Sequence, residues 1–109
     1  ALPIFMWQKE TPSRLFTWQG ALWYCNDLDL AGHSDWRLPN VRELQSIVDY
    51  GRKDPSIDPV FSAVRGPYWS SSTYVVNPTN AWTVSFSYGW VDDAGKMDAD
   101  FVRAVRRGS

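Results

Sequence analysis

The chain has 109 residues, of which 44% are hydrophobic and 16% aromatic, a size and composition that fit a single domain over residues 1–109 and exclude a disordered chain. Eleven Lys and Arg residues against twelve Asp and Glu residues give a formal net charge of −1, which excludes the strongly basic surface typical of nucleic-acid-binding proteins. No apolar run reaches the roughly 18 residues of a membrane span, no signal peptide is recognisable, and the start at Ala1 indicates an excised or processed piece.

An opening strand and a first helix are predicted from residues 4–32. Residues 4–8 form a short apolar run, which is typical of a strand that enters a turn. Thr17 is a suitable N-cap for a helix whose apolar residues recur at i, i+3, i+4 and i+7, and Gly32 is the expected end of that helix. Trp23 falls opposite the apolar stripe, so we expect it to pack under another element, contact a partner or face solvent.

A second helix is predicted to begin after Asn40. Glu43 stands three residues later, the spacing of a capping box, and Gly51 is the expected end of the helix. Residues 51–67 form a connector with two prolines, and we expect one short helical turn at residues 59–61.

The second half of the chain is predicted to be rich in strands. Residues 68–71 and 74–76 are rich in β-forming residues, and residues 81–87 alternate strictly between apolar and polar side chains. A turn is expected at residues 93–96, and residues 101–106 predict a closing strand. The order of these elements predicts an α+β domain with mainly antiparallel strands.

The alternation in residues 81–87 predicts one buried and one solvent-facing side of a strand. The side expected in the core carries Trp82, Val84 and Phe86. The side expected in solvent carries Thr83, Ser85 and Ser87.

The chain has a single Cys, Cys25, and a single His, His33. One thiol makes no intrachain disulfide and no cysteine-rich zinc site, and one imidazole makes no histidine-rich metal site. No nucleophile is recognisable beside a base. We therefore expect no enzyme activity, no catalytic residue, no metal and no cofactor.

Several blocks along the chain carry a family pattern. They are Met6-Trp7-Gln8, residues 21–25, residues 34–39 with Glu43-Leu44, Ile57-Asp58 with Phe61, residues 68–72, Ala81-Trp82 with Val84, Phe86 and Gly89, and residues 101–106. In their joint order and spacing these blocks resemble the Lcl C-terminal domain family, named for the Legionella collagen-like protein. The resemblance covers almost the whole chain.

The resemblance implies a C-type-lectin-like fold, in which two helices flank a mainly antiparallel sheet with paired terminal strands. It also implies a bacterial secreted or cell-surface location, because the family's namesake is an adhesin that binds sulfated glycosaminoglycans as a trimer. In many lectin-like domains a Cys in the first helix pairs with one in the last strand, but Ala104 stands at the matching place here. Cys25 is therefore interpreted as a small buried hydrophobic residue. A second departure is that the Arg residues are scattered, without a basic groove.

The candidate ligand-binding surface comes from the strand-rich half. Tyr and Trp give rigid amphipathic area and Asn and Ser give adaptable hydrogen bonds, as in antibody and sugar-binding surfaces. The alternative is an ordinary solvated β-surface. The candidates are Tyr74, Asn77, Asn80, Ser85, Ser87, Tyr88, Trp90 and Asp92.

The seven Trp residues divide into two expected groups. Trp23 and Trp90 are expected to contact a ligand or partner. The remaining five are assigned to the core and are Trp7, Trp18, Trp36, Trp69 and Trp82.

Charged residues give three further expectations. An acidic cluster of Asp92, Asp93, Asp98 and Asp100 lacks the spacing of a calcium loop and is interpreted as a solvated hairpin. Arg103 is expected to form a structural ion pair with Asp35 or Asp49. Arg37 is expected to cover aromatic surface next to the second helix.

These features favour a non-enzymatic extracellular recognition or adhesion module that binds a glycan, glycosaminoglycan-like by resemblance, or a cell-surface protein. One alternative is a receptor-binding domain diversified by a retroelement, because residues 74–93 are dominated by Asn, Ser, Tyr and Asp, which mutagenesis of adenine-containing codons can produce. Another is an oligomerisation or capping domain of a surface protein, a possible homo-oligomer with Trp23 at the interface. An enzyme of the formylglycine-generating type needs two cysteines and is not expected.

Overall fold

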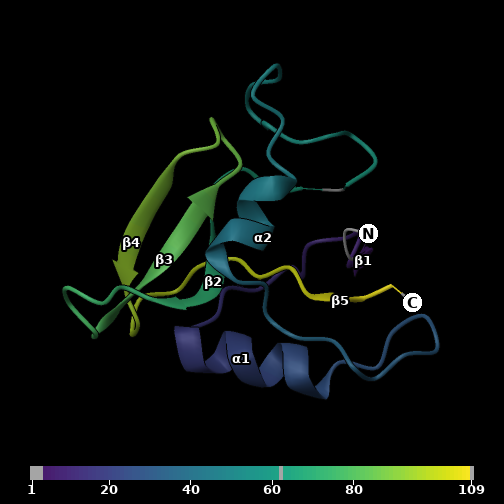
Figure 1. Ribbon diagram of the computed structural model, residues 1–109, viewed down its shortest axis with the longest axis horizontal. Helices are drawn as coiled ribbons and strands as arrows, with labels where there is room; N and C mark the ends of the chain where they lie inside the picture. Colours follow the sequence, from purple (N-terminus) through teal and green to yellow (C-terminus); the bar gives the residue numbers. More distant parts are fainter. Residues whose placement is uncertain (1–3, 62, 109) are drawn as a thin grey trace.

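The computed structural model describes residues 4–61 and 63–108, and in them two short helices accompany two antiparallel sheets (Figure 1). One sheet joins the first and last strands, and the other has the strand order β2-β3-β4. The elements are β1 (Phe5–Trp7), α1 (Trp18–Asp27), α2 (Val41–Ser46), β2 (Pro67–Thr73), β3 (Asn80–Ser85), β4 (Val91–Gly95) and β5 (Val105–Arg107). The predicted α+β class and the paired terminal strands are confirmed.

A buried arginine joins the two ends of the chain. Arg103 is fully buried, and its guanidinium donates to the carbonyl oxygens of Gln8 and Lys9, the latter at 2.7 Å, and to the hydroxyl of Thr11 at 3.0 Å. The backbone of Gln8 also donates to the carbonyl of Ala104 at 2.9 Å, and the Gln8 side-chain oxygen accepts from the Ala104 N–H at 2.9 Å. These contacts hold the β1 segment against the β5 segment.

The prediction that Arg103 forms an ion pair with Asp35 or Asp49 is wrong. Asp35 is paired with Arg106 instead, with Nε and Oδ1 at 2.5 Å, and this hydrogen bond lowers the pKa of Asp35. Asp49 is paired with Arg52 at 3.0 Å. The buried Arg103 binds main-chain carbonyls because the crossing N-terminal segment presents them to it.

The three-stranded sheet has a hydrophobic core on each face. Trp69 and Ala81 lie in the core on the side of α1, which also holds Cys25 and Ala104. Tyr68 and Val84, which are paired in register across β2 and β3, lie in the core on the side of α2 with Leu44 and Phe86. Successive strand residues point to opposite faces, so β2 and β3 contribute to both cores.

This two-sided packing corrects the prediction for Thr83. Thr83 was expected in solvent but is only 3% exposed, and its hydroxyl lies 3.3 Å from the carbonyl oxygen of Asp92. The same face carries Ala81, which α1 covers, so apolar–polar alternation does not correspond to buried and solvent-facing sides here. Ser85 and Ser87 on that side are half-buried.

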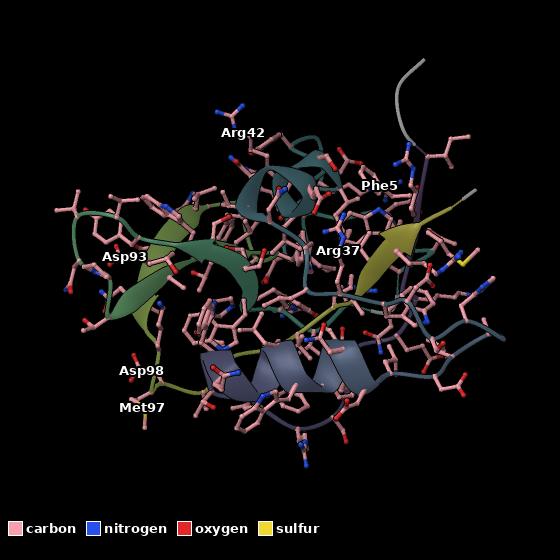
Figure 2. All side chains as sticks on the ribbon, turned by 60° about the horizontal axis from the view of Figure 1, so that its bottom comes forward. Phe5, Arg37, Arg42, Asp93, Met97 and Asp98 are labelled. Carbon is pink, nitrogen blue, oxygen red and sulfur yellow. The ribbon has the colours of Figure 1, made fainter. Side chains whose placement is uncertain are left out.

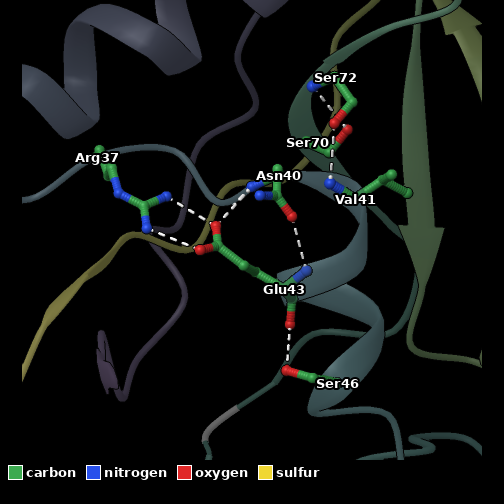
Figure 3. A network of polar contacts seen from close by, with 7 residues as sticks. All are labelled: Arg37, Asn40, Val41, Glu43, Ser46, Ser70 and Ser72. Atoms are coloured by element: carbon green, nitrogen blue, oxygen red, sulfur yellow. Dashed lines mark hydrogen bonds and ion pairs between the residues drawn. The ribbon is translucent and has the colours of Figure 1, made fainter. Parts of the chain in front are cut away.

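The start of α2 matches its prediction and anchors the helix to its surroundings (Figure 3). Asn40 Oδ1 accepts from the Glu43 N–H at 2.8 Å, and Glu43 Oε1 accepts from the Asn40 N–H at 2.9 Å. Arg37 donates both ends of its guanidinium to Glu43 at 2.7 Å, which lowers the pKa of Glu43. The Arg37 guanidinium also lies 5.9 Å from the ring centre of Phe5, so its predicted cover of aromatic surface is confirmed. The N–H of Val41 donates to the Ser72 hydroxyl of β2 at 3.0 Å.

Both helices end earlier than predicted. α1 ends at Asp27, and Gly32 lies in a separate turn with Ala31, where φ is 80° and 55° respectively. Two backbone hydrogen bonds of 3.0 Å between Leu30 and His33 close that turn, which places His33 away from the helix end. α2 ends at Ser46, ahead of Gly51. Gly32 and Gly51 therefore lie in turns that follow the helices rather than at the helix ends.

Two predictions in the strand-rich half are wrong. Residues 74–76 form a turn rather than a strand, and Val75 and Val76 are exposed. The turn expected at residues 93–96 is largely strand β4, whose Asp and Gly residues have low β-propensity but pair with β3. Acidic residues are common on such edge strands because charge prevents pairing with other chains. Residues 59–61, expected as a helical turn, form a turn closed by the Phe61 N–H and the Asp58 carbonyl at 3.0 Å.

Replacing Arg103 with Met is expected to lower the free energy of unfolding by about 3 kcal/mol, because the buried carbonyls of Gln8 and Lys9 lose a charged donor. Urea unfolding monitored by tryptophan fluorescence measures the change. Arg107→Met, at an exposed position of β5, is the matched control and should change stability by less than about 0.5 kcal/mol. Equal stability of Arg103→Met and wild type would show that the guanidinium does not hold the chain ends together.

Candidate functional site

The site is a groove on the face of the three-stranded sheet that α1 leaves partly open. Register pairs Pro67 with Ser85 and Thr83 with Asp92, so these four side chains lie on one face. The core on the side of α1 includes Trp69 and Ala81 of this sheet, and Ala94 packs against it. The open part forms a depression of about 260 Å³, which we call the Trp90 groove. Its lining residues are Pro67, Thr83, Ser85, Trp90, Asp92, Asp93 and Ala94.

Trp90 stands at the edge of this groove in the turn that joins β3 to β4. The Ser85 N–H donates to the Trp90 carbonyl at 2.8 Å, and the Gly89 N–H donates to the Ser85 carbonyl at 2.8 Å, which closes the turn. The indole of Trp90 is 70% exposed and the phenol of Tyr88 48% exposed. Their ring centres are 5.4 Å apart at an interplanar angle of 30°. The turn therefore presents a pair of aromatic rings to solvent.

Tyr50 adds a third exposed ring that the sequence did not predict. It is 67% exposed and lies against Gly89, where a Cβ atom would come 3.0 Å from Tyr50 Cε1 and 2.6 Å from Val48 Cγ1. The connector is held there by the Asp54 N–H, which donates to the Ser87 carbonyl at 2.6 Å. Gly89, with φ of 83°, was the only sequence signal for this close approach, and it does not identify the ring.

The structure divides the predicted ligand-binding residues into two groups. Ser85, Trp90 and Asp92 line the Trp90 groove, Tyr88 packs on Trp90, and the Ser87 N–H donates to the Ser85 hydroxyl at 3.2 Å.

The second group lies at the other end of β3, about 17 Å away along the strand. Tyr74 packs edge-on against Trp82, with ring centres 4.8 Å apart. Asn77 Oδ1 accepts from the Thr79 hydroxyl and Asn80 Nδ2 donates to Asp93, both at 2.7 Å. Tyr74 and Asn77 thus pack or bond within the β2–β3 hairpin, whereas Asn80 reaches the groove only indirectly, through its hydrogen bond to the groove-lining Asp93.

Asp93 and Asp98 of the acidic cluster lie on the side of the molecule away from Phe5 (Figure 2). Within residues 4–61 and 63–108, no group of three or more His, Cys, Asp or Glu side chains is placed to hold a metal ion. Asp92 Oδ1 accepts from the Asp93 N–H at 2.8 Å. Burial, and then the charge of Asp98, raises the pKa of Asp100 from 3.8 to about 6.

The tryptophans largely follow the predicted division. Trp36 and Trp69 are buried. Trp7, Trp18 and Trp82 are half-buried, which is less than predicted. Trp23 is 63% exposed on α1, as its position opposite the apolar stripe indicates.

Cys25 is fully buried, so its interpretation as a small hydrophobic residue is confirmed. Burial also raises the pKa of its thiol to about 12. The thiolate, which is the nucleophilic form, is therefore not available at neutral pH.

These features define an α+β domain with paired terminal strands and an aromatic-edged groove. The chain matches the model of the Lcl C-terminal domain over residues 4–106, and it belongs to that family. Membership indicates a domain of a bacterial surface protein. A search of curated proteins found no match. No helix in the described part of the chain is long and apolar enough to cross a membrane.

Replacing Asp100 with Asn is expected to stabilise the domain by about 1 kcal/mol at pH 7, because burial and Asp98 disfavour the folded-state carboxylate. The folded-state pKa of Asp100 exceeds the unfolded one, so protonation contributes stability that is complete below about pH 4 and is lost as pH rises through about 6. The advantage of Asp100→Asn over wild type should therefore grow over this range. Urea titrations at successive pH values measure it, and an advantage independent of pH would contradict the assignment.

Proposed function

We propose that this domain is a non-enzymatic recognition module with a C-type-lectin-like fold, which acts at the cell surface and binds a glycan through the Trp90 groove. A protein ligand on a cell surface is the alternative occupant of the same groove. The absence of catalysis is supported by the burial of Cys25 and the raised pKa of its thiol.

The arrangement of elements supports the fold proposal. β1 and β5 pair in antiparallel register, with Phe5 opposite Arg107 and Trp7 opposite Val105. Both helices follow β1 in the chain, and the three-stranded sheet follows them (Figure 1). Paired terminal strands, two flanking helices and a loop-rich region that holds the binding surface are what the family resemblance implies for this fold.

The observation that carries the function is the exposed indole of Trp90 beside polar groups of the groove. The apolar face of a sugar ring stacks on an exposed aromatic ring, while its hydroxyls need nearby hydrogen-bonding partners. Ser85 supplies a hydroxyl and Asp92 a carboxylate in the same groove. The volume, about 260 Å³, is smaller than a typical drug-sized pocket and suits one sugar unit of a longer chain.

A second candidate function is assembly through α1. Trp23 is 63% exposed there, and large exposed aromatic residues are enriched at protein interfaces. Sedimentation at micromolar concentration tests it, since a monomer would remove obligate assembly. The retroelement-diversified receptor-binding domain stays a prediction. It requires a template repeat and a reverse transcriptase gene near the coding sequence.

Replacing Trp90 with Ala is expected to weaken glycan binding at least about tenfold, because the stacking surface is removed. A glycan array followed by titration calorimetry on the best ligand measures the loss. The fold should be unaffected, since the indole is 70% exposed.

Trp23→Ala is the matched control, since it removes an equally exposed indole from α1. It should bind the ligand as wild type does. Equal binding by Trp90→Ala and wild type, or loss of binding in Trp23→Ala alone, would show that the Trp90 groove is not the binding surface.

A further inference from the structure

The Trp90 groove is acidic. Asp92 projects from β4 on the groove face, because it is paired in register with Thr83. Asp93 also lines the groove, although its carboxylate accepts from Asn80. No Lys, Arg or His lines the groove among the described residues. The groove therefore offers an anionic ligand no cation to bind.

The basic side chains nearest in the chain are engaged elsewhere. The ammonium of Lys96 lies 4.0 Å from the ring centre of Trp18 and donates to the Thr73 hydroxyl at 3.1 Å. Arg65 pairs with Asp54 at 3.3 Å. Arg37 and Arg42 lie away from Asp93 and Asp98 (Figure 2). Among the described residues that line the groove, the charged side chains are the carboxylates of Asp92 and Asp93.

The hydrogen-bonding groups of the groove accept more than they donate. Asp92 has two carboxylate oxygens, of which Oδ1 accepts one backbone N–H. The Thr83 hydroxyl is directed to the Asp92 carbonyl, which leaves the Ser85 hydroxyl as a donor. A ligand that carries its own donors fits this set. The rings of Trp90 and Tyr88 add a surface that attracts a cation through its π-electrons.

We infer that the Trp90 groove selects saccharides that carry a protonated amine and discriminates against sulfated ones. The ammonium would bind to Asp92 beside the Trp90 indole, and the sugar ring would stack on the same indole. A sulfate group in this position would meet the Asp92 carboxylate without a compensating cation. This inference rests on the proposed glycan-binding function and adds the charge class of the ligand.

The test compares three probes on the purified domain at about pH 5.5, where sugar amines carry protons. The probes are glucosamine oligomers, N-acetylglucosamine oligomers of the same length, and heparin oligosaccharides. The first two have the same sugar backbone, and the N-acetyl group of the second replaces the charged ammonium with a neutral amide. We expect the glucosamine oligomer to bind at least about tenfold more tightly than the acetylated one, and heparin to bind more weakly than either.

The Asp92→Asn variant removes the carboxylate without changing the size of the side chain. It should lose most of the preference for the amine while keeping its affinity for the acetylated oligomer. Asp29→Asn, at an exposed position after α1, is the matched control and should keep the preference. In wild type, a rise from about 0.05 M to about 0.5 M salt should weaken the glucosamine oligomer selectively, and this holds even if Asp92→Asn fails to fold.

The outcomes separate the two proposals. Binding of the acetylated oligomer or of heparin through Trp90, with equal or higher affinity than the amine, would overturn the charge class and leave glycan recognition intact. Binding of none of the probes, together with an empty glycan array, would overturn both. A preference for the amine that survives Asp92→Asn would place the ammonium elsewhere and also overturn the inference.

Discussion

The buried guanidinium of Arg103 holds together the two ends of the chain, and the rest of the architecture depends on that closure. It donates to the carbonyls of Gln8 and Lys9 where the N-terminal segment crosses the C-terminal one. A charged donor to a buried carbonyl is among the stronger hydrogen bonds of a protein interior, and an unmatched carbonyl there is costly. In many lectin-like domains a disulfide links the first helix to the last strand, but here the corresponding residues, Cys25 and Ala104, lie in the same core without a covalent bond. Arg103 and Gln8 instead link the two ends of the chain through hydrogen bonds.

Because the paired terminal strands β1 and β5 form a sheet of their own, the three-stranded sheet is available to carry a binding surface. α1 and α2 each cover part of one face, and the hydrophobic cores fill the space beneath them. What remains open is the end of the sheet near the β3–β4 turn, where Gly89 allows the connector to approach and Tyr88 and Trp90 project. The Trp90 groove lies at this open end of the sheet.

Local patterns predicted the features that local forces determine. The capping box at Asn40, the burial of Cys25 and the exposure of Trp23 follow from spacing along one helix. The exposed Trp90 was expected beside a glycine turn. The burial of Thr83, strand β4 and the position of Tyr50 were not predictable, because each depends on a segment distant in sequence: β2 and β4 on either side of Thr83, β3 beside β4, and the connector against Gly89. Tyr74, Asn77 and Asn80 shared the composition of a binding surface, and composition alone does not show which end of a strand they occupy.

We propose that recognition takes place at Trp90. The seven tryptophans make it directly observable, because each gives one indole N–H signal in a proton–nitrogen correlation spectrum of the labelled domain. During titration with the glucosamine oligomer, we expect the Trp90 signal to shift most, while the signals of buried Trp69 and of Trp23 on α1 stay in place. A titration in which the Trp23 signal moves and the Trp90 signal does not would contradict it.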